Sequence, residues 1–82
     1  MERIMFVDLL VEENAELKQY TYTVRTSDGC RYIMHSCKRK LYDAIRSARA
    51  EGNEQHLCDI LLTAASMVLK SHDVCFDTLE LL

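Results

Sequence analysis

The sequence predicts an α+β domain with the element order β-β-β-α-α-β, in which an antiparallel helix pair packs on one face of a small antiparallel sheet. Three patterns lead to this prediction. Residues 18–26 alternate between apolar and polar side chains with the period of a strand, whereas residues 54–71 are apolar with the period of a helix. Residues 41–48 carry a narrower apolar stripe, again at helical spacing. The chain of 82 residues is 49% hydrophobic and 28% charged, which is typical of one ordered domain, residues 1–82.

The first segment, residues 3–11, is a short and almost continuous apolar run. Periodicity does not distinguish a buried strand from a buried helix in such a run. The side chains of Ile4, Phe6 and Val7 favour a strand, and the acids that follow would oppose the dipole at a helix C-terminus. We therefore predict a strand that is buried on both faces, followed by a polar connection over residues 12–16.

Residues 18–26 form the clearest of the predicted strands. Tyr20, Tyr22 and Val24 share one face of this strand, and the polar residues between them share the other. We expect the face with the tyrosines to turn toward the core, which leaves the polar face for solvent.

A hairpin follows this strand, and its loop length decides which residues pair. The sequence Ser-Asp-Gly that ends at Gly29 fits a three-residue loop, with the glycine where a positive φ is needed. This loop pairs Val24 with Tyr32 and Tyr22 with Met34, so the apolar faces match. A two-residue Asp-Gly loop would shift the register by one residue and mix the faces. We therefore predict the three-residue loop.

Residues 37–51 are predicted to form the first helix, with Ser36 as the residue that caps its N-terminus. Gly52 follows the helix and suits the left-handed conformation in which helices commonly end. One side of this helix would be buried, and its basic residues would lie on the rest of its surface. The predicted buried stripe consists of Leu41, Ala44, Ile45 and Ala48.

Residues 54–71 are predicted to form the second helix, capped by Asn53. Apolar side chains cover nearly all of its circumference, so neighbours must cover the helix on several sides. It is therefore the central helix of a small core, or the core of a dimer. The polar side chains fall on one narrow line, which consists of Asp59, Thr63, Ser66 and Lys70.

Residues 74–82 are predicted to form the last strand, although their alternation is less regular. The first and last predicted strands are both nearly apolar, so they are either neighbours in the sheet or partners across a dimer. The apolar end, residues 79–82, has no evident cover in a monomer. We therefore expect a homodimer that forms through this strand and the helix over residues 54–71.

The charges divide the chain into an acidic, a basic and an acidic part. Residues 1–17 hold five acids and one base, residues 18–49 hold eight bases and two acids, and residues 50–82 hold six acids and one base, for a net charge of −3. Much of this charge would be neutralised across one small fold. The basic residues of the first helix are nevertheless the strongest candidates for contact with a partner. They are Lys38, Arg39, Lys40, Arg46 and Arg49.

The sequence contains no motif of an enzyme, and we predict a small non-enzymatic protein that regulates another protein by binding it. Inhibitors, immunity proteins, antitoxins, adaptors and phage-type antagonists are of this kind. The alternative is a regulator that binds nucleic acid through the basic helix 37–51 and the adjacent hairpin, whose tyrosines would stack on bases. Against this alternative, the isoelectric point is about 5.5, and no RNP, KH or helix-turn-helix signature is present.

Three of the four cysteines follow a histidine by two or three residues, and thiolate and imidazole are the usual ligands of zinc. His56 and Cys58, however, would point about 200° apart on a helix, so they cannot chelate one ion together. No C-x-x-C pair is present, and we expect buried thiols, no metal and no cofactor. Cys37 is the best candidate for a reactive thiol, because three basic residues follow it at a predicted helix N-terminus.

The expected location is the cytoplasm. An even number of cysteines would suit the disulfide framework of a small secreted domain, but the N-terminal segment lacks the pattern of a signal peptide. Reduced thiols in the cytoplasm are therefore the expectation. The longest apolar run is far shorter than the roughly 20 residues that a membrane helix needs, so we expect no membrane contact.

Overall fold

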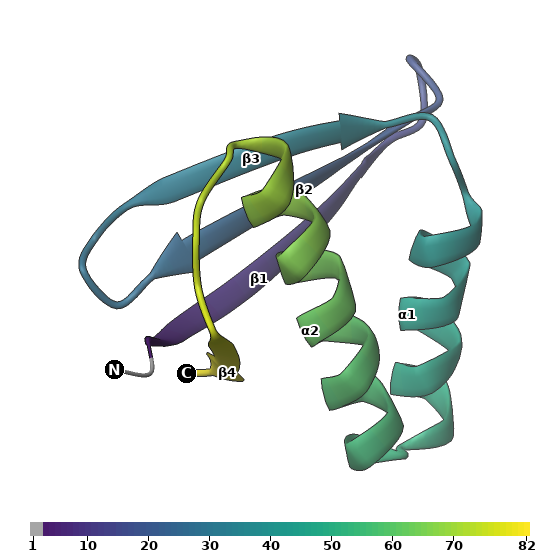
Figure 1. Ribbon diagram of the computed structural model, residues 1–82. Coiled ribbons are helices and arrows are strands. Elements are labelled where there is room, and N and C mark those ends of the chain that lie inside the picture. The colour runs from purple at the N-terminus through teal and green to yellow at the C-terminus, as the bar shows by residue number, and fades with distance from the viewer. Residues whose placement is uncertain (1–2) are drawn as a thin grey trace.

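The computed structural model describes residues 3–82, so Met1 and Glu2 of the predicted domain lie outside it. In this part of the chain, four strands form one sheet and two helices lie on one side of it (Figure 1). The elements are β1 Ile4–Asn14, β2 Gln19–Thr26, β3 Arg31–Ser36, α1 Lys40–Glu51, α2 Glu54–Ser71 and β4 Thr78–Leu81. The predicted α+β class and the predicted order of elements are confirmed.

The sheet has the strand order β3-β2-β1-β4 and is mostly antiparallel. Only β4 pairs parallel with its neighbour β1, which places Ile4 beside Thr78 and Val7 beside Leu81. The first and last strands are therefore sheet neighbours, one of the two predicted arrangements. The last strand begins later than predicted, because a parallel partner must be approached by a crossover and residues 74–77 provide its final part.

The hairpin between β2 and β3 has the predicted three-residue loop. Val24 pairs with Tyr32 and Tyr22 pairs with Met34, so apolar side chains share one face across both strands. Gly29 has a φ of 90°, in the left-handed region that a side chain makes unfavourable. Loop chemistry and side-chain alternation thus agree on which side chains of the hairpin face the helices.

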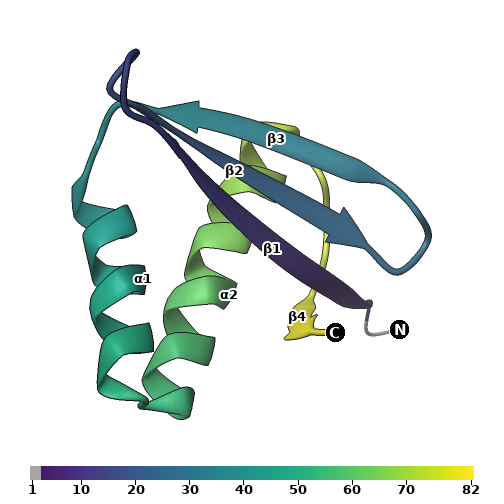
Figure 2. The same cartoon turned by 180° about the vertical axis from the view of Figure 1, so that it is seen from behind.

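β1 differs from the prediction in its length and in its burial. It extends to Asn14, through acids that were predicted to form a connection, because those residues pair with β2. Val7 and Leu9 are buried under α2, but Phe6 and Leu10 on the opposite face are exposed. The prediction of a strand buried on both faces is therefore wrong, because both helices lie on the same side of the sheet (Figure 2).

The turn between the helices is as predicted. Gly52 ends α1 with a φ of 71°, in the left-handed region. The Asn53 side chain caps α2 by accepting a hydrogen bond from the backbone N–H of His56 at 3.2 Å. The two helices form an antiparallel hairpin whose turn lies away from the sheet in both views (Figures 1 and 2).

The start of α1 differs from the prediction. Ser36 pairs with Tyr20 as the last residue of β3, which holds its backbone extended, so it does not cap a helix. Its hydroxyl instead accepts a hydrogen bond from the backbone N–H of Lys38 at 3.1 Å, within the connection to α1. Arg39 occupies the N-cap position, but its side chain makes no capping hydrogen bond, and the helix begins at Lys40. Two of the basic residues therefore precede the helix.

The core lies between α2 and the sheet, while α1 packs mainly against α2. Ile45 and Ala48 of α1 are buried, and Leu41 and Ala44 are partly buried, as the predicted stripe requires. The residues of the central cluster come from both helices and from β1 and β2. They are Val7, Leu9, Tyr20, Tyr22, Val24, Ile45, Ala64, Ala65, Val68 and Leu69.

The central helix α2 is less completely covered than its sequence predicts. Its side chain Met67 is 48% exposed and lies on the same side as Thr63 and Lys70. Residues 57–62, in the half of α2 that projects beyond the sheet, are only partly buried or exposed. α2 is covered less than expected because α1 packs on one of its sides and the sheet covers only its C-terminal half.

Candidate protein-interaction surfaces

The five basic residues predicted to bind a partner lie in two adjoining parts of the structure, and all five are exposed. Two precede α1 and three lie on it. Arg46 and Arg49 are about one turn apart and share a side of α1. Lys38 and Lys40 instead border an apolar groove at the start of the helix. We refer to Lys38, Arg39, Lys40, Arg46 and Arg49 as the basic segment.

Two residues of the basic segment contact other side chains of α1. Arg39 Nε lies 3.4 Å from Asp43 Oδ1, and this carboxylate raises the pKa of the guanidinium. The guanidinium carbon of Arg46 lies 5.9 Å from the centre of the Tyr42 ring. An exposed ion pair of this kind stabilises a fold only slightly. Within residues 3–82, the members of the segment without a carboxylate partner are Lys38, Lys40, Arg46 and Arg49.

α1 is held in place by a few contacts: two buried side chains that pack on α2, and one tyrosine ring beside Arg46 that packs on the sheet. Ile45 and Ala48 are buried against α2. The Tyr42 ring stacks on the Tyr20 ring of β2, with 4.6 Å between the ring centres. Burial raises the pKa of the Tyr42 hydroxyl, and the nearby carboxylate of Glu13 adds to the increase. These contacts fix the helix so that its charged side faces solvent.

An apolar groove of about 350 Å³ lies where β2, β3, α1 and α2 meet. Lys38 and Lys40 border it, and a partly buried serine completes it. The rest of its lining consists of Tyr22, Met34, Leu41, Ala44 and Met67. Because these residues come from four separate elements, no local pattern in the sequence predicts the groove. We call it the lysine-bordered groove.

No helix covers one face of the sheet (Figure 2), and this face carries large apolar side chains that solvent reaches. Antiparallel sheets with one uncovered face usually place polar side chains there. The exposed fractions are 50% for Ile4, 40% for Phe6, 51% for Leu10 and 48% for Ile33. We call this surface the open sheet face. Its signal in the sequence is the almost continuous apolar run of the first strand, which predicts burial on both faces.

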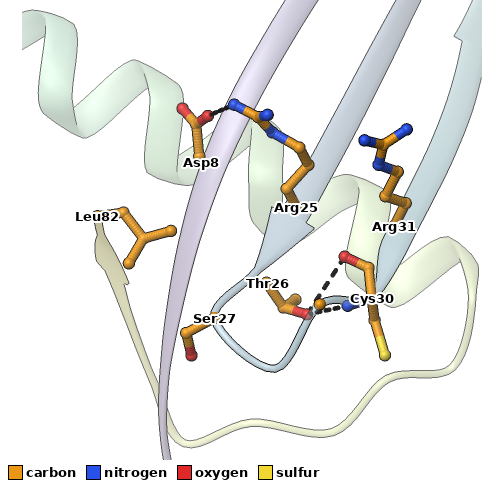
Figure 3. A pocket seen from close by; sticks show the side chains of 8 residues that line it. Asp8, Arg25, Thr26, Ser27, Cys30, Arg31 and Leu82 are labelled. Carbon is orange, nitrogen blue, oxygen red and sulfur yellow. Dashed lines mark hydrogen bonds and ion pairs between the residues drawn. The ribbon is translucent and has the colours of Figure 1, made fainter.

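An open pocket of about 490 Å³ lies at the hairpin end of the open sheet face (Figure 3). Arg25 of β2 forms an ion pair with Asp8 of β1, which neutralises one of the two cations there. Arg31 stands beside this pair with no carboxylate partner among residues 3–82. Leu82 lies across the pocket from the arginines (Figure 3). The pocket thus joins mixed charges to an exposed leucine.

The polar groups at the base of this pocket hold the hairpin loop together. The Thr26 hydroxyl donates a hydrogen bond to Asp28, and the backbone N–H of Cys30 donates to both side chains, at 3.2 and 3.3 Å. The bond from Thr26 and then those from Cys30 lower the pKa of the Asp28 carboxyl. These groups are occupied by the turn.

No protein-family model, curated protein or solved structure matches the chain. In residues 3–82, no helix has both the length and the hydropathy needed to cross a bilayer.

The tyrosines that the nucleic-acid alternative requires are turned into the fold. Tyr20 and Tyr22 are buried, as expected for the face of β2 that turns toward the core. Tyr32 is partly buried, and its ring lies 5.5 Å from that of His72. The hairpin arginine Arg25 is paired with a carboxylate. The hairpin therefore offers little to a stacked base, which leaves the basic segment as the surface for phosphates.

The cysteines are free thiols, and the prediction that they are buried is wrong. Cys30, Cys37 and Cys75 are exposed, because they lie in the connections that flank β3 and precede β4. Cys37 precedes the first helix by three residues, so it does not lie in the first turn as predicted. No group of three His, Cys, Asp or Glu side chains in the described part of the chain could hold a metal ion.

His72, which follows α2, contacts the outer edge of the sheet. Its Nε2 lies 2.8 Å from the carbonyl oxygen of Ile33 and donates a hydrogen bond to it. β3 is an edge strand, so this carbonyl points away from β2. The histidine therefore has a structural role at the edge of β3.

Proposed function

We propose that this protein is a non-enzymatic regulator that binds another protein, and that the basic segment contacts an acidic surface of that partner. The observation that carries the proposal is the presence of exposed cations without carboxylate partners beside an exposed apolar groove. Cations alone would suit any polyanion. Cations next to an apolar recess suit an acidic protein surface, whose charged rim surrounds apolar side chains.

This arrangement fits a regulator that acts by occupying its partner. The classes of protein in question are inhibitors, immunity proteins, antitoxins, adaptors and phage-type antagonists, which act stoichiometrically through a surface. Complementary charge would speed their association and select the partner. No catalytic residue is needed for such an action, and we propose none.

The test is charge reversal on the outward side of α1. The chain captures its partner from cells of its source organism, and the affinity is then measured with the purified partner. We expect Arg46→Glu combined with Arg49→Glu to weaken binding about 100-fold, because two attractive contacts become like-charge contacts. Both side chains are exposed, so the fold is retained.

The matched control reverses two exposed lysines elsewhere, Lys18→Glu combined with Lys70→Glu, which changes the net charge by the same amount. The control is expected to bind within a few-fold of the unchanged chain. Equal losses in both double variants would mean that total charge, and not the basic segment, determines binding. Capture of mixed DNA or RNA, weakening steeply with salt, would favour the nucleic-acid alternative instead.

Self-association is a second candidate interaction, and the open sheet face is the surface that favours it. Leu79 and Leu81 of the apolar C-terminal strand are partly buried against the core, so they have cover within the monomer. Leu82 is 71% exposed and borders the open sheet face at the pocket of Figure 3. This face carries both Asp8 and Arg31, and a surface with both signs of charge can pair with its own copy about a two-fold axis.

We expect light scattering to give the mass of a dimer, and Phe6→Glu to give that of a monomer. A carboxylate in the middle of the open sheet face would lose its water on association, which is strongly unfavourable. The control is Leu17→Glu, which places the same charge at another exposed leucine, 67% exposed in the turn before β2. A monomer for the unchanged chain, or a dimer that survives Phe6→Glu, would contradict this prediction.

A further inference from the structure

The lysine-bordered groove is apolar in a way that suits an inserted side chain. Its walls are the aliphatic and thioether groups of Met34, Leu41, Ala44 and Met67. Methionine side chains are flexible and polarisable, and they adapt to apolar groups of different shape. Met67 is 48% exposed on a side of α2 that is otherwise polar, so an apolar group in the groove would remove it from water. The volume of about 350 Å³ is at the lower end for small-ligand sites, which fits one or two side chains.

Tyr22 provides a second and independent observation at the same place. This residue is fully buried and lines the groove. Within residues 3–82, its hydroxyl has no hydrogen-bond partner. Burying a hydroxyl without a partner is unfavourable, so an unpaired one in a native core needs a reason. Burial raises the pKa of this hydroxyl, and Tyr20 and Tyr42 add to the increase, so it keeps its proton at neutral pH and can donate to an acceptor.

The border of the groove determines the charge of what it accepts. Lys38 precedes α1 and Lys40 is its first residue, and both are exposed. No carboxylate in the described part of the chain pairs with either ammonium group. Carboxylates that flank an apolar group would meet these two cations at the entrance. An anionic flank is therefore favoured and a cationic one is disfavoured.

We infer that the lysine-bordered groove is the docking site for an apolar side chain, leucine or phenylalanine, that the partner protein presents on an acidic segment. The apolar side chain packs between Met34 and Met67, and the flanking carboxylates meet Lys38 and Lys40. Solvent does not reach the Tyr22 hydroxyl in the free chain, so it donates to an acceptor of the same segment once the anchor has moved the methionine side chains aside. This inference rests on the proposed function and adds the chemistry of the partner: an acidic segment with a large apolar anchor.

The direct test is methyl NMR with a defined peptide. The full chain, labelled at its methionine methyl groups, is titrated with the capped hexapeptide EDLFDE. We expect the signals of Met34 and Met67 to shift and saturate at millimolar peptide. Met5 does not line the groove and pairs with Leu79 of β4, so its signal is expected to stay unchanged. Two control peptides separate the contributions: EDSSDE lacks the apolar anchor, and KKLFKK reverses the flanking charge. Neither control is expected to shift these signals at the same concentration.

A matched pair of variants on α1 tests whether the groove is the binding site. Ala44→Phe fills the groove, and Ala50→Phe places the same ring on the exposed side of the same helix. We expect Ala44→Phe to weaken EDLFDE binding about tenfold or more, and Ala50→Phe to leave it unchanged. Lys38→Glu combined with Lys40→Glu is expected to weaken it similarly without altering the fold. If all three variants bound EDLFDE with the affinity of the unchanged chain, the inference would be overturned.

Tyr22→Phe tests the hydroxyl alone. Removing an unpaired buried hydroxyl is not expected to lower the melting temperature, while loss of one hydrogen bond to the ligand would weaken peptide binding about fivefold. A lower melting temperature with unchanged peptide affinity would mean that the hydroxyl serves the fold. In that case its assignment to the ligand is wrong.

The same variants distinguish this inference from the proposed function. Against the purified partner, Arg46→Glu combined with Arg49→Glu tests the basic segment outside the groove, and Ala44→Phe tests the groove. Weaker binding in the first and unchanged binding in the second would overturn the groove and leave the proposed function. The reverse result would support the groove and overturn the outward side of α1 as a contact.

Discussion

Leu69→Ala is expected to lower the free energy of unfolding by about 3 to 4 kcal/mol. Leu69 is fully buried in the central cluster, where α2 crosses the sheet. Its truncation removes apolar contacts and leaves a cavity, because helix and strands cannot close around the smaller side chain. A chain of this size has only a few kcal/mol of stability to lose. Denaturation by urea, followed by circular dichroism, measures the change, and the variant is expected to unfold at little or no urea.

The matched control is Met67→Ala on the same helix. Met67 is 48% exposed, so its truncation is expected to cost less than about 1 kcal/mol. The two variants shorten large apolar side chains two residues apart, and they differ mainly in burial. A similar loss in both variants would contradict the placement of the core between α2 and the sheet.

Ile45→Ala is the second change with a large expected effect, a loss of about 2 to 4 kcal/mol. Ile45 is 1% exposed and is the largest of the side chains that bury α1 against α2. Since α1 packs mainly on α2, losing this contact loosens the helix that carries the arginines of the basic segment. Hydrogen exchange should therefore show faster amide exchange in α1 than in α2, together with weaker binding of the partner.

Ser47→Ala is the control for this prediction, because Ser47 is exposed on the same helix. Its effect on unfolding is expected to stay within about 0.5 kcal/mol. Equal acceleration of amide exchange in both helices of Ile45→Ala would mean that α1 does not open independently of α2. Partner binding would then follow global stability and not the position of α1.

The parts of the fold that the sequence predicted correctly are those where two local rules agree. The three-residue loop ending at Gly29 and the alternation of Tyr22 and Val24 both require the same register, and the structure has it. Gly52 and Asn53 mark the turn between the helices from opposite sides, one by backbone conformation and one by its side chain. Each of these features depends on residues that are close in sequence.

The errors arise where a distant contact competes with a local preference. Ser36 is a good helix cap by composition, but pairing with Tyr20 keeps it in the sheet, so α1 starts at Lys40. The continuous apolar run of β1 is consistent with cover on both faces, yet the helices cover only one. Whether one face of a strand is covered or both depends on the whole fold. A short stretch of sequence does not determine it.

Of the candidate sites, likewise, one was predictable from residues close in sequence and one was not. Exposure of the basic segment was predictable, because its residues lie outside the apolar stripe of α1. The lysine-bordered groove was not, since Tyr22, Met34 and Met67 come from β2, β3 and α2 and meet only after folding. The unpaired hydroxyl of Tyr22 is likewise a property of its surroundings, and its residue type gives no indication of it.

The parallel pairing of Ile4 with Thr78 also sets an order of events during translation. The strand that emerges first from the ribosome acquires its second neighbour only after residues 78–81 have followed it out. Until then one backbone edge of β1 stays open to any other extended chain nearby. Nascent copies on one messenger RNA can thus pair wrongly through this edge until the closing strand appears, and a pause before it would lengthen the exposure.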